Sequence, residues 1–139
     1  MRGLIFIISF ITAISFSSCS EDLVGPMPSG AYSYKSYDST GTAIVQGWLT
    51  IDFEDSTKIS GNWYFEKIGN PQRIGPQVGG GELVGGLRDG IIEIGLNPQF
   101  KDSNVFLSGT MDSGKYRGKW IYASFPGLTN YGTFEAMKN

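Results

Sequence analysis

Residues 81–97 have the sequence GELVGGLRDGIIEIGLN, and this stretch decides the fold class. Two apolar runs flank Asp89-Gly90, a residue pair that is typical of the two-residue type I′ turn of a β-hairpin. A turn centred there places Leu87 opposite Ile92 on one face of the hairpin, with charged or small residues on the other face. The stretch therefore predicts two half-buried antiparallel strands.

Two further turns predict hairpins of the same kind. Ser113-Gly114 is a second two-residue turn, and it sets opposite charges beside each other on the solvent side. Residues 55–57 join another pair of runs and place Trp48 opposite Tyr64 on the outer face. In each hairpin apolar residues meet apolar ones, and a shift by one residue would turn every side chain to the wrong face.

The same alternation recurs through the rest of the chain from residue 30 onward. No stretch there holds a helical period, and short links favour a meander in which successive strands are neighbours. We therefore predict an all-β domain, an eight-stranded antiparallel up-and-down β-barrel. The expected strands are 30–37, 43–54, 58–68, 81–88, 91–97, 104–112, 115–124 and 130–138.

A repeat of large apolar residue, any residue, glycine, any residue, large apolar residue runs through these strands, as in residues 45–49 and 116–120. Period two places each glycine on the inner face, where it leaves room for an aromatic ring from a neighbouring strand. Alternating small and large interior residues suit a narrow closed barrel, which also removes both sheet edges. The alternative is an open sandwich in which these glycines mark independent β-bulges.

In strand number and in their Gly-x-aromatic steps, residues 30–138 resemble the small lipocalin-like and avidin-like meander barrels. Gly30-Ala31-Tyr32 stands where lipocalins have Gly-x-Trp, and no residues match the biotin contacts of avidins. The resemblance therefore implies a barrel architecture and no particular ligand.

The first residues have the layout of an export signal. Arg2 precedes an apolar run from Leu4 to Phe16, which is shorter than the ~20 residues of a membrane span. Phe16-Ser17-Ser18-Cys19 resembles the lipobox of bacterial lipoproteins, with Phe where the family usually has Leu. The resemblance implies cleavage before Cys19 and acylation of that cysteine, with palmitate among the acyl chains. The alternative is an ordinary secretory signal with a chance cysteine near its end.

Cys19 is the single cysteine of the chain, and lipidation explains an unpaired cysteine in an exported protein. We expect a lipid-anchored protein of the bacterial cell envelope, in the outer membrane. Ser20-Glu21-Asp22 resembles an acidic tag that some Gram-negative bacteria use for surface export, although the start of a solvated tether has the same composition. The expected organisation is a signal peptide at 1–18, a lipidated tether at 19–29 and the barrel at 30–139.

Composition excludes several kinds of function. Removal of residues 1–18 takes Arg2 away and leaves ten basic side chains against 13 acidic ones, with no basic block for nucleic acid. The chain has no histidine, and its one cysteine is the expected lipid anchor. His-dependent triads, His metal sites and thiol catalysis are therefore excluded, and we expect no catalytic residue, no metal and no cofactor.

The inward-facing positions predicted from the alternation carry no carboxylate, which argues against an enzyme. Two interpretations stay open: a pocket for one small apolar or aromatic ligand oriented by tyrosine hydroxyls, or a filled core. The candidate ligand-binding residues are Tyr32, Tyr34, Trp63, Phe65, Tyr116, Trp120, Tyr122 and Phe134. The other expected inward residues are Leu49, Ile51, Phe53, Leu83, Leu87, Ile92, Ile94, Leu96, Leu107 and Met111.

Link lengths alternate between the two ends of the predicted barrel. The tight turns lie at one end, and the longer links 69–80, 98–103 and 125–129 lie at the other. Loops on a rigid scaffold often bind ligands, so the long-loop end is the candidate mouth. The first strand begins at the tight-turn end, and the tether would therefore leave from the end opposite the mouth. The candidate mouth residues are Arg73, Phe100, Lys101, Phe125, Pro126 and Leu128.

The sequence favours a membrane-anchored, non-enzymatic binding lipoprotein that holds a small apolar or aromatic ligand at the long-loop end. The alternative is a filled barrel that serves a protein partner as an accessory subunit or an enzyme inhibitor. The outer pairs Trp48/Tyr64 and Phe106/Ile121 are candidate contacts for such a partner or for a glycan. A third hypothesis, a hydrolase, needs Asp38 and Asp102 to form a carboxylate pair.

Overall fold

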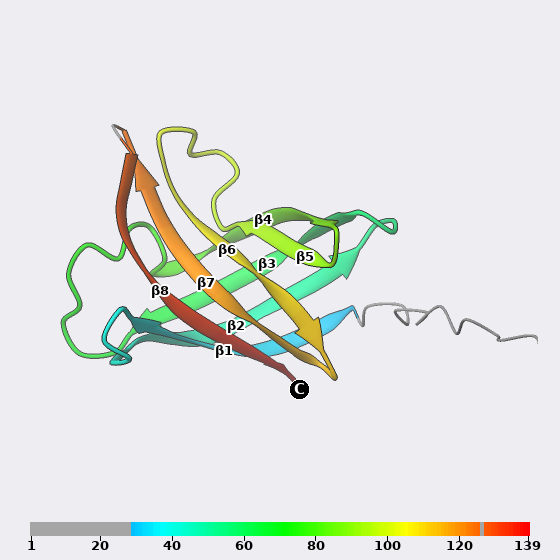
Figure 1. Ribbon diagram of the computed structural model, residues 1–139, viewed down its shortest axis with the longest axis horizontal. Coiled ribbons are helices and arrows are strands. Elements are labelled where there is room, and N and C mark those ends of the chain that lie inside the picture. The colour runs from blue at the N-terminus through cyan, green and yellow to red at the C-terminus, as the bar shows by residue number, and fades with distance from the viewer. Residues whose placement is uncertain (1–28, 126) are drawn as a thin grey trace, which may run out of the picture.

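The computed structural model describes residues 29–125 and 127–139. They form one closed antiparallel barrel, in which each strand pairs with the next along the chain and the last strand returns to pair with the first (Figure 1). The predicted eight-stranded up-and-down barrel is confirmed, and the open sandwich is excluded. The predictions for the signal peptide, for Cys19 and for the tether up to residue 28 lie outside the described residues.

The observed strands follow the predicted runs to within a few residues. The fourth begins two residues earlier than predicted and the fifth ends two residues earlier. No helix in the described part of the chain is long and apolar enough to cross a membrane. The strands are β1 (Gly30–Asp38), β2 (Ala43–Phe53), β3 (Lys58–Lys67), β4 (Gly79–Arg88), β5 (Ile91–Gly95), β6 (Ser103–Asp112), β7 (Lys115–Ser124) and β8 (Gly127–Lys138).

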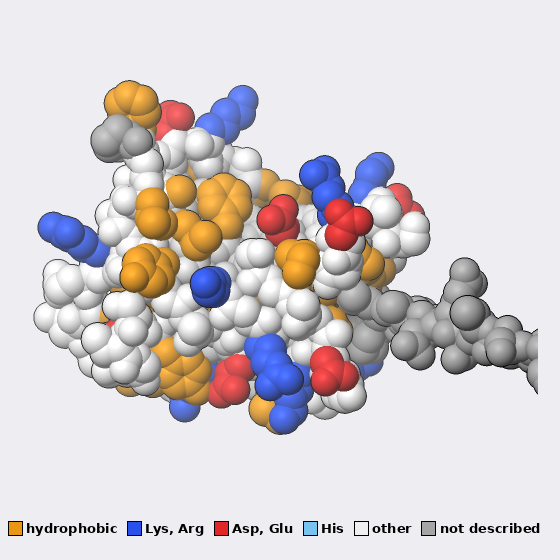
Figure 2. All heavy atoms as spheres, in the orientation of Figure 1, with side chains coloured by type: hydrophobic (Ala, Val, Ile, Leu, Met, Phe, Trp, Pro, Cys, Tyr) orange, Lys and Arg blue, Asp and Glu red, His pale blue; other side chains and the backbone are white. Residues whose placement is uncertain are grey.

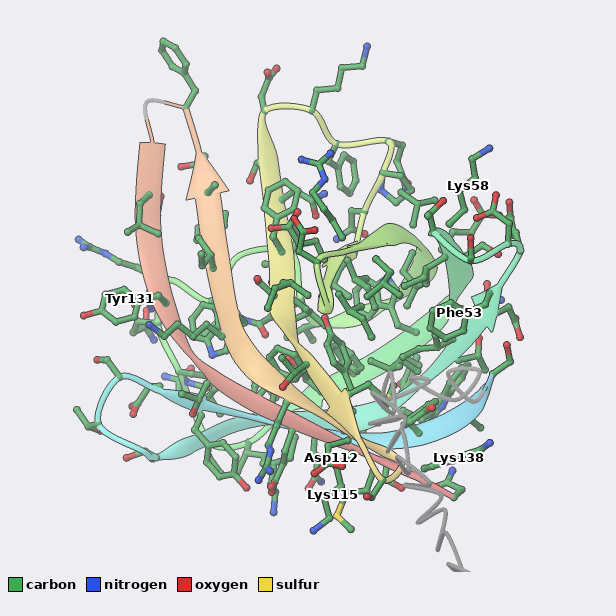
Figure 3. The ribbon with its side chains drawn as sticks, turned by 45° about the vertical axis from the view of Figure 1, so that its right-hand side comes forward. Phe53, Lys58, Asp112, Lys115, Tyr131 and Lys138 are labelled. Carbon is green, nitrogen blue, oxygen red and sulfur yellow. The ribbon has the colours of Figure 1, made fainter. Side chains whose placement is uncertain are left out.

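The two-residue turns have the backbone that their sequences predict. Asp89 and Gly90 both have positive φ, 51° and 76°, as the two central residues of a type I′ turn must. Ser113 and Gly114 also have positive φ, 48° and 77°. Asp112 and Lys115 pair with each other on either side of this turn (Figure 3). The predicted registers follow, with Leu87 opposite Ile92, Asp112 opposite Lys115 and Trp48 opposite Tyr64.

Inner glycines face large inner residues across the ladder, as the repeat predicts. Gly132 pairs with Trp120, and a Cβ on Gly132 would collide with the Tyr37 carbonyl oxygen and crowd the Trp120 indole. A Cβ on Gly118 would likewise collide with the carbonyl oxygen of Ser108. At these two positions the neighbouring strands lie too close together for a larger residue, and glycine there permits the tight coiling of a narrow barrel.

The core fills the barrel with the residues that the alternation placed inside. Each of the 18 predicted inward residues is either buried or packed against the buried cluster. The half-buried members of that predicted set are Phe53, Leu87, Met111 and Tyr122. The core also contains residues outside that predicted set of 18: Ile44, Val45, Ile59, Ile74, Val105 and Ala136.

The link between β7 and β8 is shorter than predicted, and the prediction of a loop at 125–129 was wrong. Ser124 pairs with Gly127 and Ala123 with Leu128, so the link is the two residues 125 and 126. A register shift beside Ala123 lets the ladder continue to this point. Gly127 and Leu128, which were expected in the loop, therefore belong to β8.

Two of the three links that were predicted to be long, between β3 and β4 and between β5 and β6, are long, and β1 begins at the opposite end of the barrel, as predicted. Gly30 pairs with Ile51, and the Phe53 amide donates a hydrogen bond to Ser29 Oγ at 3.0 Å, so β1 begins beside the β2–β3 hairpin. Figure 1 shows loop 68–78, which joins β3 to β4, at the opposite end of the barrel. The described domain therefore begins at the hairpin end, away from its longest loop.

Candidate functional site

The eight candidate ligand-binding residues form the packed interior of the barrel. Seven are buried, with at most 3% of the side chain exposed, and Tyr122 is half-buried. Tyr34 stacks on Phe65 with ring centroids 4.0 Å apart, and Phe134 meets the ring of Tyr116 edge-on at 4.7 Å. The rings therefore fill the space between one another, which is the arrangement of a core.

Three of the interior residues have polar groups bonded to backbone carbonyl oxygens of the barrel, whereas the buried hydroxyl of Tyr34 has no hydrogen-bond partner among the described residues. Trp120 Nε1 donates to the Tyr37 carbonyl oxygen at 2.7 Å, and Trp63 Nε1 donates to the carbonyl oxygen of Leu96. The Tyr116 hydroxyl lies 3.1 Å from the Ile92 carbonyl oxygen, and burial raises the pKa of that phenol well above its usual value. These three groups are therefore bonded to backbone carbonyl oxygens that lie beyond the adjacent strand.

Loop 68–78 covers the long-loop end of the barrel. Ile74 packs against the core, and Gln77 is fully buried, with its side-chain amide donating to the Ile74 carbonyl oxygen at 2.6 Å. Two asparagines hold the loop from outside it: Asn97 Nδ2 donates to the Pro76 carbonyl oxygen at 2.8 Å, and Asn130 Nδ2 donates to that of Arg73 at 3.1 Å. The loop therefore closes the end that the sequence analysis named as a mouth.

The candidate mouth residues do not line a common opening among the described hollows. Phe100 and Lys101 line a groove beside β5, while Phe125 lies with Lys101 in a separate, smaller hollow. Phe125 is 91% exposed at the tip of the β7–β8 hairpin, and Leu128 is exposed on β8. Pro126 lies outside the described residues. Phe100, Lys101, Phe125 and Leu128 therefore lie at separate places on the outer surface of the long-loop end.

Asp38 is one member of the carboxylate pair that a hydrolase would need. Its carboxylate is hydrogen-bonded within the turn between β1 and β2. Its carboxylate accepts hydrogen bonds from the Thr40 hydroxyl at 2.7 Å and from the Thr40 and Thr42 amides at 2.9 Å. The Thr40 hydroxyl is the largest cause that lowers the pKa of Asp38, followed by the Thr42 amide. Asp102 contributes its carbonyl oxygen to the Phe125 amide at 3.0 Å. The interactions of Asp38 are those of a turn-capping residue.

A groove of about 530 Å³ lies on the outer face of the barrel, across β8, β1, β2 and β3. The barrel register arranges its side chains in two adjacent rows that cross these strands. One row is mostly apolar: Met137, Ser33, Trp48 and Tyr64. The other is polar: Glu135, Lys35, Gln46 and Glu66. Gly47 and Tyr34 complete the lining.

The apolar row presents two aromatic rings to solvent. Trp48 and Tyr64 pair directly across β2 and β3, and each is 44% exposed. Met137 of β8 is 47% exposed at the other end of the row. Ser33 lies between Met137 and Trp48, and its hydroxyl donates to Asn139 Oδ1 at 2.6 Å. Because this side chain is small, the surface of the row is recessed between its two apolar ends.

The polar row contains two carboxylates that tyrosine hydroxyls hold in position. The Tyr64 hydroxyl donates to Glu66 Oε1 at 3.2 Å, so one aromatic ring of the groove orients its own polar neighbour. The Tyr37 hydroxyl donates to Glu135 Oε1 at 2.7 Å, and this hydrogen bond is the largest cause that raises the pKa of Tyr37. Each carboxylate retains acceptor capacity for a ligand, because a carboxylate has about four lone-pair sites.

A second surface, which we term the apolar belt, crosses the outer face of β4 to β8. The register aligns Val84 with Gly95, Gly95 with Phe106, Phe106 with Ile121 and Ile121 with Tyr131. Figure 2 shows hydrophobic side chains gathered over β6, β7 and β8, and Figure 3 shows Tyr131 pointing outward from β8. A groove of about 850 Å³, lined by Gly85, Gly86 and Gly95 among others, lies along the belt and includes its residues Val84 and Phe106. The belt is defined by Val84, Phe106, Ile121 and Tyr131.

Two of the ten residues that line the outer groove could be placed together from the sequence. It placed Trp48 and Tyr64 together on the outer face, because one hairpin sets their register. Met137 and Glu135 could not be placed in the groove, since they reach it only through the closure of β8 on β1, for which the sequence contains no turn signal.

Comparison of the chain with protein-family models, with curated proteins and with solved structures finds no match in any of the three.

Proposed function

We propose that this chain is a membrane-anchored, non-enzymatic binding lipoprotein that holds its ligand in the outer groove of Trp48 and Tyr64. The lipid anchor at Cys19 and the cell-envelope location rest on the lipobox-like sequence. The observation that carries the binding site is the contrast between the two aromatic sets: the interior rings are stacked and covered, whereas Trp48 and Tyr64 are each 44% exposed in a groove.

The composition of the groove supports this proposal. Sites for small ligands combine apolar or aromatic surface with a few fixed polar groups that orient the ligand. Here the apolar surface comes from Trp48, Tyr64 and Met137, and the fixed polar groups are the carboxylates of Glu66 and Glu135. The volume of about 530 Å³ is within the range of ~300–1,000 Å³ that is usual for ligand pockets.

The tryptophans provide a direct test of ligand binding. The chain has three, and Trp63 and Trp120 are 3% and 0% exposed, so acrylamide quenching of fluorescence reports on Trp48. Residues 20–139 would be mixed with a delipidated extract of the source cell envelope. We expect protection of Trp48 from quenching and a retained small molecule in native mass spectrometry.

Variants locate that binding. Trp48→Ala should release the molecule, and Phe106→Ala, which removes an equally exposed ring from the belt, should keep it. An unprotected Trp48, or retention that survives Trp48→Ala, would contradict the outer groove as the binding site.

A second function, docking of a protein partner as an accessory subunit or inhibitor, is favoured by the apolar belt. Val84, Phe106 and Tyr131 are each about half exposed, at 48%, 45% and 53%. Contiguous exposed apolar surface is typical of protein interaction sites. Phe106→Arg should abolish co-purification of such a partner while Trp48→Ala leaves it intact, and the reverse result would place the partner in the groove instead.

A further inference from the structure

We propose that the outer groove binds a neutral oligosaccharide, with sugar rings lying on Trp48 and Tyr64 and with sugar hydroxyls bonded to the polar row of Lys35, Gln46, Glu66 and Glu135. This inference rests on the proposed binding function and names its ligand class. The structural basis is the side-by-side placement of an aromatic row and a hydrogen-bonding row in one groove.

The aromatic row matches the apolar side of a sugar. A pyranose ring has one face covered by C–H groups, and these carry the slight positive charge that the negative face of an aromatic ring attracts. Trp48 and Tyr64 lie opposite each other on adjacent strands, which are ~4.8 Å apart, a spacing comparable to the width of one pyranose ring. The recess at Ser33 connects the aromatic pair with Met137, so the apolar row is long enough to contact more than one sugar unit.

The polar row matches the edge of the same sugar. Each sugar hydroxyl both donates and accepts, and the row supplies both kinds of partner: Gln46 has donors and an acceptor, and Lys35 donates only. The carboxylates accept, and because tyrosine hydroxyls already hold one oxygen of each, less conformational entropy is lost when a ligand binds. A ligand with an apolar face and a hydroxyl-rich edge therefore satisfies both rows at once.

The charge of the groove selects among saccharides. Glu66 and Glu135 outnumber Lys35, so the groove carries a net charge of −1 within its lining. This charge disfavours uronic acids, sulfated sugars and phosphate-bearing headgroups, since like charges placed together destabilise a complex. An extended peptide is also disfavoured, because the eight described strands form a closed barrel and leave none of their edges in the groove for main-chain pairing.

The test uses residues 20–139 and two panels of saccharides. Neutral mono- to hexasaccharides of glucose, xylose, mannose and galactose form the first, and the matching uronate-containing saccharides form the second. We expect at least one neutral compound to protect Trp48 from acrylamide and to give a calorimetric binding curve. Affinity should rise from the monosaccharide to the trisaccharide, and the uronates should not bind.

Four variants assign the binding to the two rows. Trp48→Ala and Tyr64→Ala should each weaken binding by about tenfold or more, as expected for a central aromatic contact. Gln46→Ala, which keeps both rings, should also weaken it and serves if an aromatic variant fails to fold. Phe106→Ala removes an exposed ring at 45% exposure from the belt and should leave the affinity unchanged.

The outcomes separate this inference from the proposed function. If no saccharide binds but the envelope extract still protects Trp48, the ligand class is wrong and the groove remains the binding site. If neither protects Trp48, both proposals fail. If uronates bind as well as neutral sugars, the charge argument is overturned, and if Phe106→Ala abolishes sugar binding, the assigned groove is wrong.

Discussion

Tyr34 of β1 and Phe65 of β3 stack face to face across Gly47 of β2, with ring centroids 4.0 Å apart and ring planes 8° from parallel. Gly47 pairs with both residues, so the strand between the two rings contributes no side chain at that level. The glycine repeat of the sequence therefore has a packing role: it lets aromatic rings from two flanking strands meet over the strand between them.

This relationship predicts that Gly47→Ala destabilises the barrel. A Cβ at Gly47 would collide with the Tyr64 carbonyl oxygen and lie 3.0 Å from the Phe65 ring. Overpacking of this kind costs about 1–3 kcal/mol, which urea unfolding followed by circular dichroism would measure. Gly81→Ala is the control, because its Cβ would meet nothing closer than 3.4 Å, and it should change the free energy of unfolding far less. Equal losses in the two variants would contradict the packing role.

Removal of a ring from the same stack should reduce the free energy of unfolding more than the added methyl group of Gly47→Ala does. Phe65 is fully buried and contacts the rings of both Tyr34 and Trp63, with the Trp63 centroid 5.0 Å away. Phe65→Ala removes both ring contacts and leaves a cavity, so we expect a loss of about 3–5 kcal/mol in the free energy of unfolding. Phe106→Ala makes the same chemical change at a residue that is 45% exposed, and thermal unfolding should show a much smaller shift in Tm. A small loss at Phe65 would mean that neighbouring side chains collapse into the space.

The hydroxyls of two buried tyrosines should contribute differently to stability. The Tyr116 hydroxyl lies within hydrogen-bonding distance of the Ile92 and Leu107 carbonyl oxygens, at 3.1 and 3.2 Å. The Tyr34 hydroxyl is near that of Ser36, but neither has the geometry of a hydrogen bond to a described group. Tyr116→Phe should therefore cost about 0.5–1.5 kcal/mol at neutral pH, whereas Tyr34→Phe should be neutral or stabilising in the same urea titration. A clear loss in Tyr34→Phe would show that its hydroxyl is bonded in solution.

The same two phenols should make the barrel sensitive to alkali. Burial raises the pKa of Tyr34 and of Tyr116 above the ordinary value of 10.0. A phenol that stays protonated in the folded state but ionises in the unfolded state favours folding fully below pH 10, and this stability is lost as pH rises above 10. Urea midpoints measured from pH 8 to pH 11.5 should fall above pH 10, and the fall should be smaller in the Tyr34→Phe/Tyr116→Phe double variant. An equal fall in the double variant would assign the alkaline transition to other groups.

The sequence predicted the parts of this molecule that depend on short-range pairing. Asp89-Gly90 and Ser113-Gly114 fix their hairpins locally, and period two then assigns each side chain to the inside or the outside. Trp48 and Tyr64 could be placed together for this reason. The β8 side of the groove could not, because Glu135 lies beside Lys35 only after β8 closes on β1, a pairing of residues that are far apart in the chain.

The closure of one end of the barrel by loop 68–78 also could not be predicted from the sequence. Loop 68–78 is rich in Gly, Pro and polar residues, which is typical of an open surface loop. Its closure over the core depends on contacts with distant residues: Asn97 and Asn130 bond its carbonyl groups, and Ile74 packs inward. No local pattern encodes such contacts, so the length of the loop alone suggested a mouth.

Gly75 provides the sharpest test of how this loop is held. Its φ is +67°, and a Cβ there would collide with the ring of Tyr122. The Tyr122 ring is itself fixed, because its hydroxyl lies 3.2 Å from Ser103 Oγ. Gly75→Ala therefore adds both backbone strain and a collision, and it should lift the loop from the core. Hydrogen exchange should become faster at the amide of Gln77, which donates to the Gly75 carbonyl oxygen at 2.9 Å.

The matched control for this prediction is Gly69→Ala. Gly69 has almost the same φ, +68°, but a Cβ there would meet no atom of the described residues within 4 Å. The two variants thus share the cost of placing alanine in a left-handed conformation, about 1 kcal/mol, and differ in the contact with Tyr122. If Gly75→Ala speeds exchange at Gln77 and Gly69→Ala does not, the ring of Tyr122 holds the loop closed. If both speed it equally, backbone strain alone explains the opening, and the packing of Gly75 on Tyr122 does not close this end of the barrel.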